Sequence, residues 1–306
     1  MTDLATTTAP TSPRELSAED RRHAKRPVPT GQRVKSVIKH ILLVAAACVM
    51  IYPLIWMLVS SLRPGDLIFR TPGLVFDNFT TENYEYGWDA LGRPFGTYMI
   101  NSVIVSAGSI LGNVVTCSLA AYAFARLRFT AKNILFAIML LTIMLPFHVL
   151  IVPQYIVFSK LGMLGTFWPL ILPKLLATDA FFVFLLVQFI RGLPRELDEA
   201  ALIDGCGHFR IFFNIIMPLL VPAIATTAIF TFIWTWNDFF GSLLYLSGRE
   251  ELYTVQLGLR AFQDSSGLTN WGAIFAMSVL SLIPIFLAFL FGQRFLIRGI
   301  ATTGIK

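Results

Sequence analysis

Residues 199–205 read Glu-Ala-Ala-Leu-Ile-Asp-Gly and lie in a short polar stretch between two long apolar runs. Pro194 suits the first position of a helix, because the N–H that proline lacks would have no partner there. Acidic side chains in the next turns favour the positive end of the helix dipole. Gly205 can adopt the left-handed conformation that ends a helix. The pattern predicts a helix that begins at Pro194 and ends near Gly205. Roughly ten helical residues at 1.5 Å per residue give a length of about 15 Å.

A helix of this length is marginal in water on its own. Two interpretations fit the residues alone: an ordinary helix at the membrane surface, and a helix held by a protein outside the membrane. A loop between two apolar runs has no need of a compact, capped helix. We therefore infer that a partner surface holds it.

The composition is that of a membrane protein. Of 306 residues, 56% are hydrophobic and 14% are charged, whereas about 45–50% apolar residues are usual in a soluble domain. Runs long enough to cross a bilayer, about 20 residues each, lie near 35–61, 97–125, 133–158, 167–190, 211–245 and 271–296. The sequence therefore predicts an all-α membrane protein with six transmembrane helices. The fifth run exceeds one span, so part of it should lie in the interface or form a separate segment.

Lysine and arginine are concentrated in alternate segments: the first forty residues, 126–132, 191–210 and the C-terminal tail. The positive-inside rule places these segments, and so both termini, in the cytoplasm. The net charge of +6 then marks sidedness, and no nucleic-acid partner is expected. Residues 1–34 lack a hydrophobic period and are predicted to form a disordered basic cytoplasmic tail, which leaves residues 35–306 as the membrane domain. The run 97–125 is rich in small residues and should be the central helix.

Sequence motifs for catalysis are missing from the chain: there is no nucleophile elbow, HExxH, P-loop or paired-cysteine zinc spacing. We expect no enzyme activity, no metal site and no ATP use by this chain itself. Lys174 and Asp179 are charged residues within an apolar run. Five residues apart, they would point about 140° away from each other on a helix. We expect both to reach water at the outer surface and not to pair. So few charges argue against an ion-coupled secondary transporter of small solutes, which remains the alternative function.

The polar stretch resembles a known motif. Glu199-Ala200-Ala201, Gly205 and Met217-Pro218 resemble the EAA loop of the membrane subunits of ATP-binding-cassette (ABC) importers, with Met217 where the family has leucine. Further segments resemble the second, six-span permease of maltose-type carbohydrate importers: Pro53–Trp56, Ser60–Leu62, Asn83-Tyr84, Asn101-Ser102, Ala120–Arg126, Trp236–Phe239 and Gln293–Gly299. The resemblance covers roughly residues 40–306.

The resemblance implies the type I ABC importer permease fold, with a cytoplasmic coupling helix at about 194–206. This chain would form half of a sugar path in the bilayer of a bacterial or archaeal cytoplasmic membrane. Its partners would be a second homologous permease subunit, a dimer of ATPase subunits and an extracytoplasmic sugar-binding protein. The chain would bind no cofactor, and ATP and magnesium would be used by the partner ATPase.

The resemblance also assigns roles to residues. Glu199 and Asp204 would contact polar groups of the ATPase, Ala200 and Ala201 would permit close approach, and Gly205 would end the coupling helix. Arg294 and Arg298, in the C-terminal tail, could also touch the ATPase. Trp236, Asn237 and Asp238 are candidates for the substrate path, since aromatic and amide groups there could contact sugar. They could equally serve packing, and both alternatives remain open.

Overall fold

The computed structural model describes residues 30–74, 78–263 and 269–303, and these residues contain helices and connecting segments only. The first long helix, α2, runs from Thr30 to Ser61. It therefore begins before the predicted boundary at residue 35, and the rest of the predicted tail, residues 1–29, lies outside the described residues. The boundary between two parts of the chain, residues 1–54 and 55–306, falls within α2. Within the described residues, all the other helices belong to the second part.

Four helical segments of the described chain are long and apolar enough to cross a membrane: 35–61 within α2, α4 (Phe95–Arg126), the pair α7 (Trp168–Leu175) and α8 (Ala180–Arg191), and 271–295 within α15 (Trp271–Thr303). Two further candidates are sharply bent. The chain bends by 103° between α5 (Lys132–Ile143) and α6 (Phe147–Lys160). The chain also bends by 77° before α12 (Val221–Trp236). The segment on the other side of this bend consists of α10 (His208–Ile211), η1 (Phe212–Ile216) and α11 (Met217–Leu219). Counted as one span each, the bent pairs give the six predicted spans.

Shorter helices lie between these spans. They are α3 (Glu82–Asp89), α9 (Glu196–Ile203), α13 (Phe239–Leu246), η2 (Glu250–Leu252) and α14 (Val255–Ala261). The α13 helix accounts for the extra length of the fifth apolar run. That run is longer than one span because it holds a bent helix and then a separate short helix, as the sequence predicted.

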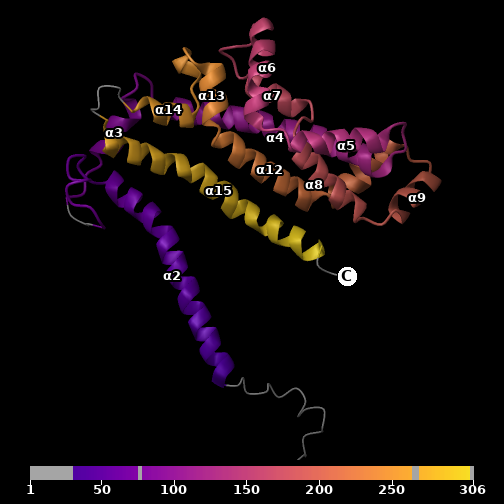
Figure 1. Ribbon diagram of the computed structural model, residues 1–306, viewed down its shortest axis with the longest axis horizontal. Coiled ribbons are helices and arrows are strands. Elements are labelled where there is room, and N and C mark those ends of the chain that lie inside the picture. Colours follow the sequence, from indigo (N-terminus) through magenta and orange to yellow (C-terminus); the bar gives the residue numbers. More distant parts are fainter. Residues whose placement is uncertain (1–29, 75–77, 264–268, 304–306) are drawn as a thin grey trace, which may run out of the picture. The chain divides into compact units, whose positions relative to one another are not determined.

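The central helix of the second part is α4, which packs against α12, α8 and α7 (Figure 1). Its buried face carries small or polar residues, which let helix backbones approach closely in lipid. At Gly112 a Cβ atom would lie 2.8 Å from the backbone carbon of Lys174, so only glycine fits against α7 there. The predicted central role of this run is confirmed.

In the described part of the chain, three hydrophobic clusters include residues of α4, and two of them lie at its ends. One, near its N-terminal end, joins Phe95 and Tyr98 to Trp236 of α12 and Met277 of α15. The other, near its C-terminal end, joins α4 to α8 and η1 and also includes Ala201 of α9. The second cluster anchors the short helix between the fourth and fifth spans.

We predict that Gly112→Ala destabilises the protein by about 1–3 kcal/mol, because the added methyl group must push α7 away from α4. Thermal unfolding of the detergent-solubilised protein measures the effect. Gly207→Ala is the matched control, since no heavy atom lies within 4 Å of the added carbon there. Equal melting temperatures for the two variants would contradict the packing described here.

Candidate functional site

The short helix α9 contains the central part of the quoted stretch. It runs from Glu196 to Ile203, eight residues, with Arg195 as N-cap and Asp204 as C-cap. Pro194 lies outside the helix, so its predicted place at the first helical position is wrong. The preceding segment contains a turn at residues 192–193 and the helix begins only after Arg195. The predicted acidic first turn is confirmed.

The C-terminal end of α9 has a complete Schellman motif. Gly205 has a φ of +79°, as predicted from the sequence. Its N–H donates to the carbonyl of Leu202 at 3.1 Å, and the N–H of Cys206 donates to the carbonyl of Ala201 at 2.9 Å. These are the two bonds that define the motif. The chain is thus turned sharply toward the next span.

The two faces of α9 differ. Ala201 is buried in the hydrophobic cluster formed by α4, α8 and η1, so it packs inside this chain and not against an outer surface. Glu199, Ala200 and Asp204 are exposed. Ile203, the last residue of α9, is 86% exposed, and Phe209 of the following α10 helix is 76% exposed. Apolar side chains and carboxylates therefore share the outer side of this region.

An ion pair connects α9 to α4. The Nε atom of Arg126, the last residue of α4, lies 2.8 Å from Oδ2 of Asp198. The N–H does not point along this contact, so the interaction is an ion pair and not an aligned hydrogen bond. Burial raises the pKa of the Asp198 carboxyl above its ordinary value, and the positive charges of Arg126 and Arg195 oppose that rise. Arg126 and Asp198 are 72 positions apart in the sequence, and no local pattern predicts that they pair.

A groove of about 480 Å³ lies beside this ion pair. It is lined by side chains of α4, α9, α10 and the loop after α4, and both polar and apolar groups face it. Glu199 and Leu202 of α9 are among its walls. The groove extends the outer side of α9 toward the end of α4.

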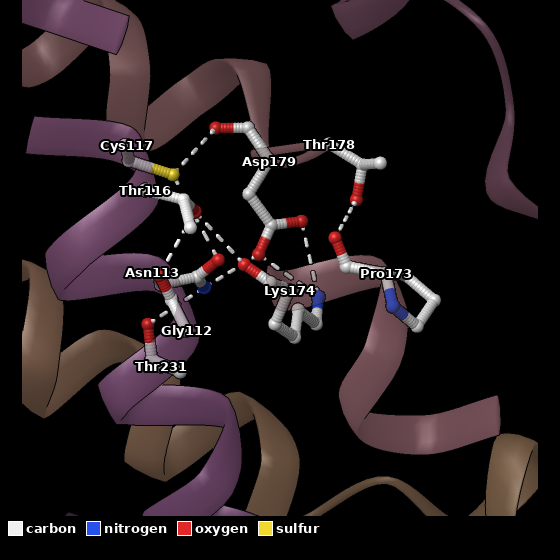
Figure 2. A network of polar contacts seen from close by, with 9 residues as sticks. All are labelled: Gly112, Asn113, Thr116, Cys117, Pro173, Lys174, Thr178, Asp179 and Thr231. Carbon is white, nitrogen blue, oxygen red and sulfur yellow. Dashed lines mark hydrogen bonds and ion pairs between the residues drawn. The ribbon is translucent and has the colours of Figure 1, made fainter. Parts of the chain in front are cut away.

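A second polar cluster lies inside the membrane-spanning region, where α7 ends and α8 begins. Lys174 Nζ lies 3.0 and 2.9 Å from the two carboxylate oxygens of Asp179 (Figure 2). The prediction that these residues do not pair is therefore wrong. It assumed one continuous helix, whereas α7 ends at Leu175, Ala177 has a φ of +54° and α8 starts only at Ala180. The break turns the two side chains toward each other.

The central helix completes this cluster. Asn113 Nδ2 donates to Asp179 Oδ2 at 2.6 Å and to Thr231 Oγ1 of α12 at 3.1 Å. Thr116 donates to the carbonyl of Lys174 at 3.1 Å. Figure 2 shows these side chains converging on the break from α4 and α12. We expected Lys174 and Asp179 to reach water separately at the outer surface. The structure instead holds both residues in a hydrogen-bonded network that includes Asn113 and Thr116 of α4. A buried amide in the middle of an apolar run, Asn113, was the sequence signal that could have indicated it.

The candidate substrate-path residues lie at the end of α12. Trp236 is fully buried and its indole N–H donates to the carbonyl of Ser281 at 3.1 Å. Asn237 is exposed, and its amide donates to the carbonyl of Ile233 at 2.8 Å. Asp238 accepts from the N–H of Gly241 at 2.9 Å and so caps α13. Trp236 thus packs between α12 and α15 in this conformation, and contact with sugar stays a prediction for Trp236, Asn237 and Asp238.

The two tail arginines lie on the last turns of α15. The guanidinium carbon of Arg294 is 4.8 Å from the centre of the Phe295 ring. The side chain of Arg298 and residues 304–306 lie outside the described part. Contact of this tail with an ATPase stays a prediction.

We predict that Asp179→Ala lowers the free energy of unfolding by about 1.5–3 kcal/mol, because it leaves a largely buried ammonium group without its charged acceptor. Thermal or denaturant unfolding of the solubilised protein measures this loss. Asp66→Ala is the control, since Asp66 forms an exposed ion pair with Arg70 at 3.9 Å. The control should change stability by less than about 0.5 kcal/mol. An equal effect of both substitutions would disprove the structural importance of the network.

Comparisons with known proteins extend this description. Residues 112–302 match the family model for "binding-protein-dependent transport system inner membrane component". The chain is 34% identical over 255 residues to a probable ABC transporter permease protein of Bacillus subtilis, covering 83% of each chain. It is 33% identical over 263 residues to an arabinooligosaccharide transport system permease protein of Halalkalibacterium halodurans, covering 85% of this chain and 92% of the relative.

A solved structure has the same fold. It is a chain of a bacterial ABC transporter involved in the import of the acidic polysaccharide alginate. The TM-score is 0.77 at 19% sequence identity, and the match covers 89% of this chain and all of the other. At this identity the likeness concerns the fold alone.

Proposed function

Because the chain belongs to the family of binding-protein-dependent transport system inner membrane components, we propose that it couples the sugar path of an ABC importer to a cytoplasmic ATPase through α9. The chain is a non-catalytic, multi-pass permease subunit of the cytoplasmic membrane. The proposed partners are a second homologous permease, a dimer of ATPase subunits and an extracytoplasmic sugar-binding protein. The partner ATPase would use ATP and magnesium, and this chain would bind neither.

The outer side of α9 is the observation that carries the proposal. Ile203 is exposed there together with the carboxylates of Glu199 and Asp204, and Phe209 of the following α10 helix is exposed as well. Water suits the carboxylates but not the apolar groups, and lipid tails suit only the apolar groups. A protein surface with an apolar pocket and a polar rim suits both. We infer that a cleft of the ATPase covers this side of α9.

The polar network at the α7–α8 break weighs against the alternative, an ion-coupled transporter. Such a transporter needs an intramembrane charge that can bind and release an ion. The carboxylate of Asp179 is occupied by Lys174 and Asn113. The opposite charges of Lys174 and Asp179 compensate each other in this pair, which supports a structural role. ATP therefore remains the proposed energy source.

The substrate is proposed from relatives. One relative is named for the transport of arabinooligosaccharides, so short oligosaccharides are the first candidates for this chain. Closure of the ATPase dimer on ATP would move α9 and turn the spans, which would open the sugar path outward. Uptake of a panel of radiolabelled oligosaccharides by the complete complex in proteoliposomes identifies the solute.

We predict that Glu199→Lys abolishes sugar uptake or reduces the amount of ATPase that copurifies, because the new positive charge faces the docked surface. Copurification and uptake by proteoliposomes are measured on the same preparation. Glu82→Lys makes the same change of charge at an exposed position of α3, on the opposite side of the membrane in the proposed topology. Wild-type ATPase retention and uptake in Glu199→Lys would refute the docking of α9.

The proposed topology predicts that α9 and both termini are cytoplasmic. A cysteine introduced as Thr130→Cys, an exposed position in the 126–132 loop that this topology places on the same side as α9, should react in intact cells only with a membrane-permeant maleimide, in a chain lacking Cys48, Cys117 and Cys206. Cysteines are placed in the same way at Thr2 and Lys306. Labelling of any of the three by an impermeant maleimide in intact cells would show that the orientation is reversed.

A further inference from the structure

We propose that Arg126 is a positioning residue that fastens α9 to the central helix α4, so that a displacement of α9 is passed to α4. This inference rests on the proposed docking of α9 to an ATPase. It assigns a role to the last residue of Ala120–Arg126, a segment that the docking proposal leaves unexplained. Arg126 itself touches neither substrate nor nucleotide in this role.

One guanidinium group holds both the helix and the loop that leads into it. Arg126 Nε pairs with Asp198 of α9 at 2.8 Å. The Nη2 atom of the same side chain donates to the carbonyls of Leu193 at 2.8 Å and Pro194 at 3.4 Å. The two charged side chains are only 6% and 14% exposed. The connection is therefore buried and has several points of contact.

Other links between α9 and the membrane helices are few. In the described part of the chain, α9 has no extensive packing interface with any other helix. Ala201 is the one residue of α9 that is buried in the hydrophobic cluster beside α4. Tyr122, one turn before Arg126 on α4, packs its ring 5.3 Å from that of Phe212 in the same cluster. The ion pair and the contact of Ala201 with this cluster together connect α9 to α4, and we call this connection the joint.

The chemistry of arginine fits the role of a joint. Its planar guanidinium has separate donors in fixed directions and stays charged, whereas lysine offers one compact ammonium group. A largely buried ion pair is a poor source of stability, because desolvation offsets much of its attraction. Apolar residues of similar size could hold the helices together as well. The pair gains its value by fixing the orientation of α9 relative to α4.

Because α4 is the central helix, a force that reaches it through the joint acts on the centre of the bundle. α4 packs against α7, α8 and α12, and its Asn113 holds the break between α7 and α8 through Asp179. A force applied to α9 therefore reaches the centre of the bundle through Arg126. Without the pair, α9 could follow the ATPase while α4 stays in place.

The test uses the complete complex with its ATPase and sugar-binding protein in proteoliposomes. The readout is the number of sugar molecules imported per ATP hydrolysed, with the oligosaccharide of the panel that the wild type imports fastest. We expect Arg126→Gln and Asp198→Asn each to lower this ratio at least about fivefold while ATP hydrolysis continues. The double variant should be no worse than either single one, since both remove the same interaction. Arg70→Gln, which removes a guanidinium from the exposed ion pair with Asp66, should behave as wild type.

A merely structural role would give a different result. It would reduce the yield of assembled complex and leave the ratio unchanged in the complexes that form, and that result overturns the proposal. If Arg126→Gln does not assemble, Arg126→Lys is measured in the same way. It keeps the positive charge but replaces the planar guanidinium by a single ammonium nitrogen on a flexible stem, so a wild-type ratio in Arg126→Lys also overturns the proposal.

Failure of this inference is distinguishable from failure of the docking proposal. If α9 docks but Arg126 is not the joint, Glu199→Lys impairs uptake and the Arg126 variants keep the wild-type ratio. If α9 does not dock at all, Glu199→Lys retains both the ATPase and uptake. Glu199 is exposed on α9, whereas Arg126 lies at the end of α4 and pairs with the partly buried Asp198, so the two substitutions report on different steps.

Discussion

Helices inside a bilayer gain little from burying apolar surface against one another, because the lipid tails are already apolar. Their association depends on close backbone approach and on satisfied polar groups. The central helix α4 provides both. Gly112 lets α7 come within contact of the α4 backbone, and Asn113 bonds to α8 and α12 from the next position. The rest of the membrane bundle is arranged around this helix.

The break between α7 and α8 depends on the same helix. Interrupted helices are tolerated at membrane depth only where the freed polar groups find partners. Thr116 of α4 bonds the carbonyl of Lys174, and Thr178 bonds the carbonyl of Pro173. Figure 2 shows both of these contacts at the break. At its C-terminal end α4 carries Arg126, so one helix holds a polar network in its middle and the ion pair with α9 at its end.

The sequence predicted what depends on length and local pattern. The bilayer sets the length of an apolar run, so the spans and the extra segment of the fifth run could be predicted. The cap at Gly205 is equally local and was predicted correctly. The pairing of Lys174 with Asp179 was missed because angles on a continuous helix do not apply across a break. Arg126 and Asp198 were not paired because they lie far apart in the sequence and only packing brings them together. Burial of Trp236 likewise depends on α15, which no local pattern around residue 236 indicates.

The most direct test of the account is a pair of cryo-electron microscopy structures of the complete complex, one free of nucleotide and one trapped with ATP. The quantity to measure is the contact between the Arg126 guanidinium and the Asp198 carboxylate while α9 changes its position relative to the partner permease. The account predicts that the ion pair persists in both states and that α4 moves together with α9. An α9 helix that shifts on ATP binding while its ion pair opens and α4 stays in place would contradict it.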